Sequence, residues 1–124
     1  MGMPGLETVV PLVYTQGVLG KRLPLTKMVE KCCTNPAKIM GLFPRKGTIA
    51  LGSDADLVVY DPNYCGKISA KTQQMNVDYS AFEGWEIEGR PSLVTVRRKV
   101  QVRDGKFVGL LGHGQFLQRL RTHF

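Results

Sequence analysis

One stretch constrains the fold more than any other, because residues 45–62 encode a strand, a turn and a second strand by local sequence alone. Gly47 and Gly52 permit backbone angles that a side chain forbids, and the Ser-Asp pair after Gly52 can hydrogen-bond back onto its own turn. Residues 57–60 are apolar and do not alternate with polar residues, which predicts a strand covered on both faces. The Asp-Pro pair that follows is expected to stop this strand.

The front third of the chain has the pattern of helices. Residues 6–18 have the apolar density of a helix, with Pro11 in its first turn and glycines at its end. A second helix is predicted by apolar residues at helical spacing, namely Leu25, Met28, Val29, Cys32 and Cys33. The Thr-Asn-Pro sequence at residues 34–36 is expected to restart the chain as a short helix, with Thr34 or Asn35 as its N-cap and Gly41 after its end.

The remainder has the pattern of strands. Residues 63–82 are irregular and polar, with a brief strand conceivable at residues 68–70. Residues 85–88 alternate, the Gly-Arg-Pro sequence after them predicts a turn, and valines then alternate up to Val102. Asp104-Gly105 predicts a two-residue hairpin. Helices followed by strands predict an α+β arrangement or pieces of two units, and the pattern leaves that choice open.

The composition is that of one ordinary domain, with 124 residues of which 43% are hydrophobic. The chain has neither a leader pattern nor an apolar run near the ~18 residues of a membrane span, so we expect a soluble, cytoplasmic protein with no membrane partner. Its three cysteines make no disulfide framework. We expect the adjacent Cys32 and Cys33 to be buried or half-buried apolar residues rather than redox or metal groups.

The charge is concentrated near the end of the chain. The net charge is +7, and residues 97–124 contain seven Lys or Arg residues but only one acidic residue, Asp104. Aromatic residues are not interleaved with these cations, and no helix-turn-helix, zinc-finger or RNA-binding signature accompanies them. We therefore favour a solvated or interface surface over a nucleic-acid partner.

The residue chemistry predicts no catalytic and no metal-binding residue. His113 and His123 are separated by ten positions, and three or four converging ligands are needed for a metal. We interpret Asp54 and Asp56 as residues that cap backbone N–H groups of a turn rather than as a catalytic acid and base. Two other features also have structural interpretations: Glu83 and Glu86 beside Trp85 as hydrogen-bond partners, and Gly112-His113-Gly114 as a flexible turn.

Four stretches together carry a resemblance to a known family. They are Gly2-Met-Pro-Gly-Leu-Glu7-Thr8, residues 34–56 with their Gly-Ser-Asp-Ala-Asp sequence, Asp78-Tyr-Ser-Ala-Phe-Glu-Gly84, and Asp104-Gly-Lys-Phe-Val-Gly with the later Gly114-Gln-Phe-Leu-Gln-Arg119. In this order and spacing, they resemble the dihydropyrimidinases and hydantoinases, the cyclic-amidase branch of the metal-dependent amidohydrolases. The resemblance covers nearly the whole chain and implies the last quarter of such an enzyme.

The resemblance implies a division of the chain. Residues 1–44 would be the helical end of a TIM-like amidohydrolase barrel, residues 45–109 part of a small β-sandwich domain, and residues 110–124 a basic tail. Gly2 would belong to a substrate-binding loop at the barrel rim. Where the family usually has a glycine in a β-domain turn this chain has Arg98, which we expect to strain a turn of positive φ by roughly 1 kcal/mol.

The resemblance also implies an activity that this chain lacks by itself. Members of the family open cyclic amides of dihydropyrimidines or hydantoins with a hydroxide held by zinc. All the zinc ligands of the family lie upstream of what is present here, so we expect no zinc and a structural role. We also expect unpaired strand edges, and hence a homo-oligomer or association with a full-length amidohydrolase as a non-catalytic module.

Overall fold

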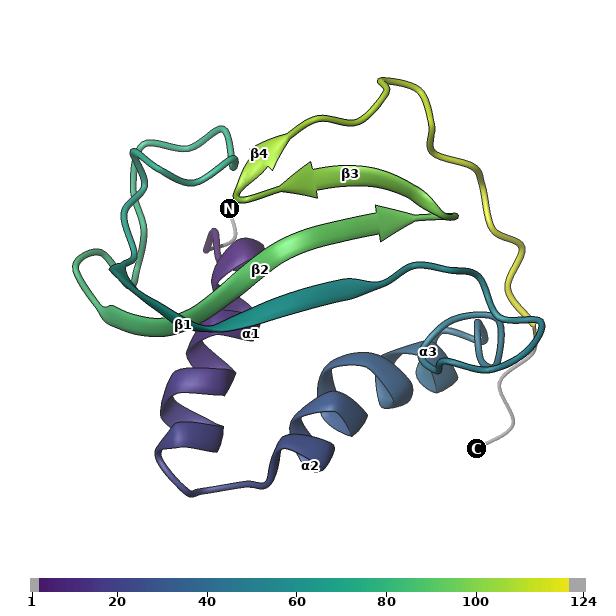
Figure 1. Ribbon diagram of the computed structural model, residues 1–124, viewed down its shortest axis with the longest axis horizontal. Helices are drawn as coiled ribbons and strands as arrows, with labels where there is room; N and C mark the ends of the chain where they lie inside the picture. Colours follow the sequence, from purple (N-terminus) through teal and green to yellow (C-terminus); the bar gives the residue numbers. More distant parts are fainter. Residues whose placement is uncertain (1–2, 121–124) are drawn as a thin grey trace. The chain divides into compact units, whose positions relative to one another are not determined.

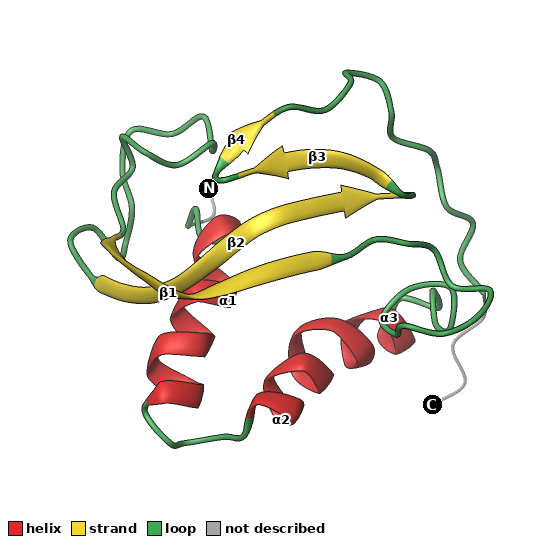
Figure 2. Cartoon of the chain, in the orientation of Figure 1, coloured by secondary structure: helices red, strands yellow, loops and turns green. Residues whose placement is uncertain are grey.

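The computed structural model describes residues 3–120 of the chain. The chain forms two compact units, each built from two segments that are distant in sequence. Unit 1 takes its residues from Met1–Met28 and Asp61–Arg90, and unit 2 takes its residues from Val29–Tyr60 and Pro91–Phe124. Figure 1 labels the helices and strands, and Figure 2 colours them by type. Helices and a small sheet are both present, which confirms the predicted α+β class.

Unit 1 begins with a helical segment whose winding changes along its length. A 3-10 turn over Leu6–Thr8 leads into α1, Val9–Leu12, and then into a π-helical stretch over Val13–Leu19. Pro11 lies in α1, close enough to the start of the segment for its missing N–H to be tolerated. Gly20 follows the last helical residue, so the predicted first helix is confirmed.

The second helical segment continues where the sequence predicted a restart. Helix α2, Leu25–Val29, is followed by a π-helical stretch over Glu30–Thr34 and then by α3, Asn35–Ile39. Thr34 keeps helical angles, with φ −68°, and its hydroxyl donates to the carbonyl oxygen of Gly47 at 2.8 Å instead of capping α3. The predicted cap is therefore wrong, because a tertiary partner takes the hydroxyl.

Gly41 ends the second helical segment, as predicted. It has a φ of +67° and directly follows Met40, the residue at the end of α3. A left-handed residue after the last turn is a common way to terminate a helix, and glycine adopts this conformation without steric cost.

The four strands form one sheet in the order β1-β2-β3-β4. They are β1, Val58–Lys67; β2, Glu86–Val96; β3, Lys99–Arg103; and β4, Lys106–Phe107. β2 pairs with β3, and β3 with β4, in antiparallel fashion. No helix within residues 3–120 is long and apolar enough to cross a membrane.

Three strand predictions were wrong in detail. Residues 45–57 contain no strand, and β1 continues through Asp61 and Pro62 instead of stopping there. β2 likewise runs through the Gly-Arg-Pro sequence that predicted a turn. Val58 and Val59 are 57% and 54% exposed, so the predicted cover on both faces is wrong. Strand pairing, which is a non-local property, overrides these local signals.

The segment after β1 is mostly irregular, as predicted, but residues 68–70 are not a strand. Ile68 is buried, its N–H donates to the Trp85 carbonyl at 2.9 Å, and its own carbonyl accepts the Gly84 N–H at 2.8 Å. Together with the buried Met28 and Thr8, Ile68 belongs to the small core of unit 1.

Two tight turns connect the last three strands. In the turn between β2 and β3, Arg97 and Arg98 have φ of +47° and +67°. In the turn between β3 and β4, Asp104 and Gly105 have φ of +49° and +76°. Two successive positive φ angles are the mark of the primed hairpin turn, so the predicted Asp-Gly hairpin and the positive φ at Arg98 are both confirmed.

Candidate functional site

Asp54 and Asp56, the acidic pair of the most constraining stretch, lie in unit 2 and are matched by two cations. Asp54 Oδ2 accepts hydrogen bonds from Arg45 Nε at 2.9 Å and Lys46 Nζ at 2.8 Å, and Lys46 also pairs with Asp56. The Lys46 bond, followed by the Arg45 bond, holds the pKa of Asp54 below its ordinary value. Burial acts to lower the pKa of Lys46, yet its bonds to both carboxylates raise it. Asp54 therefore stays ionised and is unsuited to proton transfer.

Asp56 connects this stretch to the turn between β2 and β3. Its Oδ1 accepts the backbone N–H of Arg97 at 2.8 Å, which supports the turn-capping interpretation of the acidic pair. The Arg97 guanidinium in turn donates to the carbonyl oxygen of His113, whose Nε2 lies 3.0 Å from the carbonyl oxygen of Val96. Sequence reasoning missed the role of Arg97, because its partners Asp56 and His113 lie 41 and 16 residues away in sequence.

His113 thus has a structural environment in the described chain. Its N–H lies 3.4 Å from the Leu110 carbonyl oxygen, and the preceding Gly112 has a φ of +76°. These features are those of a turn, as the sequence predicted for this glycine-rich segment.

Unit 1 contains an open apolar groove of about 320 Å³. Its lining residues are Leu12, Val13, Gln16, Gly17, Arg22, Leu23, Phe82 and Trp85. The rings of Phe82 and Trp85 meet edge to face, with centroids 5.4 Å apart. Gln16 and Arg22 are the polar residues of this lining, so the groove lacks an acid–base pair or a nucleophile. No sequence pattern predicts this groove, since its walls come from segments about seventy residues apart.

The remaining acidic candidates have structural partners in unit 1. Glu83 accepts the backbone N–H of Ala70 at 2.8 Å, and this bond, followed by one from the Ser69 side chain, lowers the pKa of Glu83. Glu86 lies 3.4 Å from Lys67 in an exposed ion pair. The structural interpretation predicted for both residues is supported.

The three cysteines are free thiols. Cys32 is half-buried, and burial, followed by the nearby Cys33, raises its pKa. Cys33 is exposed, so its predicted burial is wrong. The reason is geometric: consecutive helical residues point in different directions, and only one of the two can face the packed side.

The described residues do not fit a zinc site. Within residues 3–120 no three His, Cys, Asp or Glu side chains gather into a group that could hold a metal ion. Gly2, the predicted substrate-loop residue, and His123 lie outside the described residues.

Comparison with known proteins gives close matches over most of the chain. The amidohydrolase family model matches residues 11–108. The D-hydantoinase of Geobacillus stearothermophilus is 45% identical over 120 residues, which cover 97% of this chain and 26% of the relative. The L-hydantoinase of Paenarthrobacter aurescens is 41% identical over 118 residues, which cover 95% of this chain and 26% of the relative.

A solved structure of the D-hydantoinase (dihydropyrimidinase) from Thermus sp. matches 99% of this chain and 27% of its own, with 59% identity and a TM-score of 0.95. The chain thus spans about a quarter of the length of these relatives. Since the family model matches well over half of it, this chain belongs to the amidohydrolase family.

Proposed function

We propose that this chain is part of a hydantoinase- or dihydropyrimidinase-like amidohydrolase, which hydrolyses a cyclic amide C–N bond in hydantoins or dihydropyrimidines. The observation that carries the proposal is the 59% identity and TM-score of 0.95 to the Thermus D-hydantoinase over 99% of the chain. Agreement in both sequence and backbone over so much of the chain supports a shared whole-protein activity more strongly than fold alone would.

Within such an enzyme the role of this chain is structural. Its candidate acids, Asp54, Asp56 and Glu83, bind cations or backbone N–H groups and are not free for proton transfer. The zinc ions of the family would be held by residues outside this chain. Residues 1–44 would close the catalytic barrel, residues 45–109 would form part of a β-sandwich, and Gly2 would lie in the substrate loop.

A chimera tests the proposal. This chain replaces the matching quarter of the Geobacillus D-hydantoinase, and hydantoin ring opening is followed by ultraviolet absorbance. We expect ring opening to be retained and to depend on added zinc, whereas this chain alone binds no stoichiometric zinc and opens no ring. A chimera with a full zinc complement and a cooperative melting transition but no ring opening would contradict the shared activity. Stoichiometric zinc and activity in the isolated chain would contradict the structural role.

A second candidate function is a non-catalytic module that assembles with a full-length relative or with copies of itself in the cytoplasm. Exposed apolar side chains in unit 2 favour it, since Leu51, Leu111 and Phe116 are almost fully exposed. Co-purification of this chain with the Geobacillus enzyme would support assembly. A strictly monomeric chain at high concentration that fails to co-purify would count against it.

A further inference from the structure

The apolar groove of unit 1 has backbone hydrogen bonds behind its helical side. The Gly17 carbonyl oxygen accepts the N–H groups of Arg22 at 2.8 Å and of Leu23 at 3.2 Å, which folds the chain back onto the helical segment that it has just left. Gly17 is buried, and a Cβ at this position would lie 3.0 Å from Leu23 Cδ2, so the glycine lets Leu23 pack closely. These bonds set the backbone from which Arg22 reaches the lining of the groove.

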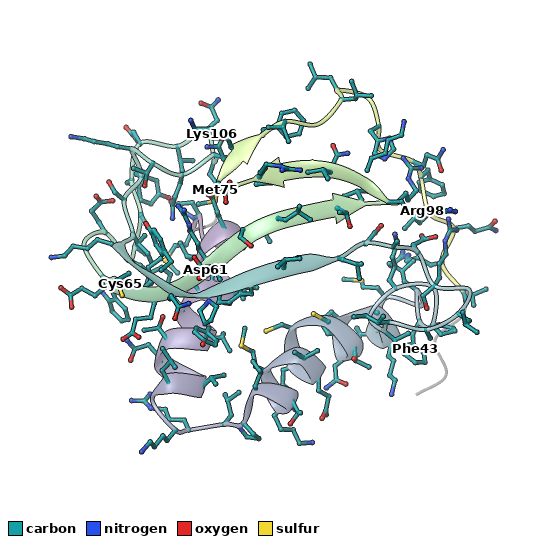
Figure 3. All side chains as sticks on the ribbon, in the orientation of Figure 1. Phe43, Asp61, Cys65, Met75, Arg98 and Lys106 are labelled. Carbon is teal, nitrogen blue, oxygen red and sulfur yellow. The ribbon has the colours of Figure 1, made fainter. Side chains whose placement is uncertain are left out.

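The aromatic side of the groove is connected to the core of unit 1. The Trp85 carbonyl oxygen accepts the N–H of the buried Ile68 at 2.9 Å, and the Ile68 carbonyl oxygen accepts the Gly84 N–H at 2.8 Å. The Trp85 N–H donates to the Phe82 carbonyl oxygen at 3.0 Å, so one turn carries both aromatic residues. Figure 3 draws the side chains of this turn and of the helical segment as sticks. Since backbone hydrogen bonds hold both sides, the groove is largely preformed, which lowers the entropy lost when a ligand binds.

One cation lines the groove without a partner carboxylate. Arg22 is exposed, and among residues 3–120 no carboxylate forms an ion pair with it. Trp85, on the aromatic side, is 49% exposed, so apolar surface is accessible in the same groove. A guanidinium recognises a carboxylate through paired N–H···O hydrogen bonds, and covering apolar surface with an apolar group is favourable. The lining therefore complements a molecule that has both an anionic and an apolar part.

We propose that this groove binds a small carboxylate with an apolar body. The body lies against Phe82 and Trp85, and the carboxylate accepts hydrogen bonds from Arg22. The groove volume of about 320 Å³ is near the lower end of the range for ligand pockets, which suits a body of about one aromatic ring. An inorganic anion would leave the apolar lining uncovered, and an uncharged apolar molecule would leave Arg22 unpaired. Because the groove has no reacting group, this binding is separate from the proposed ring opening, and either can fail alone.

The single tryptophan of the chain, Trp85, reports on the groove. The full chain is titrated with hydrocinnamate, a phenyl ring joined to a short-chain carboxylate, and Trp85 fluorescence is recorded. We expect a saturable change with a Kd of about 1 mM, as for a ligand of this size. The neutral hydrocinnamamide should bind about fivefold more weakly. Arg22→Gln should weaken hydrocinnamate binding about fivefold and leave hydrocinnamamide binding unchanged.

The matched control is Lys21→Gln, because Lys21 is exposed next to Arg22 but does not line the groove. It should bind hydrocinnamate within about twofold of the original chain. Gln16→Arg adds a second cation to the lining and should tighten hydrocinnamate binding about threefold, a gain that loss of folding cannot produce. No saturable change, equal affinities for hydrocinnamate and its amide, or equal losses in Arg22→Gln and Lys21→Gln would overturn the proposal. A Trp85 emission that shifts with protein concentration alone would assign the groove to a second copy of the chain and overturn it as well.

Discussion

Replacing Arg98 by glycine should stabilise the chain. Arg98 has a φ of +67° in the turn between β2 and β3, a conformation that costs a residue with a Cβ roughly 1–2 kcal/mol. Glycine removes this cost, but it loses more conformational entropy on folding, which lowers the free energy of unfolding by about 0.5–1 kcal/mol. The N–H of residue 98, which donates to the Ala55 carbonyl at 3.1 Å, is retained. We therefore expect a net gain of about 0.5–1 kcal/mol, or about 2–4 °C in Tm for a chain of this length.

The control is Arg98→Ala, which removes the same charge and side chain but keeps the Cβ. It should leave the free energy of unfolding nearly unchanged, because Arg98 is exposed. Arg97→Gly also relieves a positive φ, of +47°, but should destabilise because it removes the hydrogen bond from the Arg97 guanidinium to the His113 carbonyl. Urea unfolding followed by circular dichroism measures all three variants. Equal stabilities of Arg98→Gly and Arg98→Ala would show that the turn carries no strain and would refute the reasoning.

Three further substitutions test other contacts. Gly47→Ala should lower the free energy of unfolding by about 2–4 kcal/mol, measured by urea unfolding, because residue 47 has positive φ and its Cβ would lie 2.5 Å from that of Ala37. The pKa of Asp54 is lower in the folded chain than its ordinary value. Asp54 therefore stabilises the fold at pH values above the ordinary aspartate pKa, and this stabilisation is lost as the pH falls through the pKa of the folded state. Asp54→Asn should make Tm fall less steeply with decreasing pH in the acid range, as measured by a series of thermal melts. Glu83→Gln should speed hydrogen exchange of the Ala70 amide, because the Glu83 carboxylate accepts the hydrogen bond from this N–H. The pKa of Glu83 is also lowered in the folded chain, so the protection of Ala70 by Glu83 should be lost at low pH, and the variant should lack this pH dependence.

Features that a few neighbouring residues encode could be predicted from the sequence. Asp104-Gly105 specifies its turn because both residues tolerate positive φ, and the apolar spacing around Met28 specifies a helix. The predicted buried face is wrong in part, because Met28 is buried but Leu25 and Val29 are 54% and 49% exposed. The positive φ of Arg98 could be predicted because the family that the chain resembles usually has glycine at this position. For the turn and the helix the information lies within one element or one turn.

Features that depend on strand pairing could not be predicted. Asp61-Pro62 is a stop signal by local chemistry, yet β1 continues through it to Lys67. The link from Asp56 to Arg97 spans forty-one residues, and neither residue type specifies the other as its partner. The groove wall formed by Trp85 likewise depends on how distant segments pack. Such contacts are set by tertiary structure, which overrides local propensity.

The acidic pair of the most constraining stretch connects segments of unit 2 that are distant in sequence. Asp56 binds the ammonium group of Lys46 and the backbone N–H of Arg97, and Arg97 continues the connection to His113. Lys46 and Arg45 bind the neighbouring Asp54, and these two hydrogen bonds lower the pKa of Asp54. The contacts that join these segments of unit 2 are thus the same contacts that engage both carboxylates of the acidic pair.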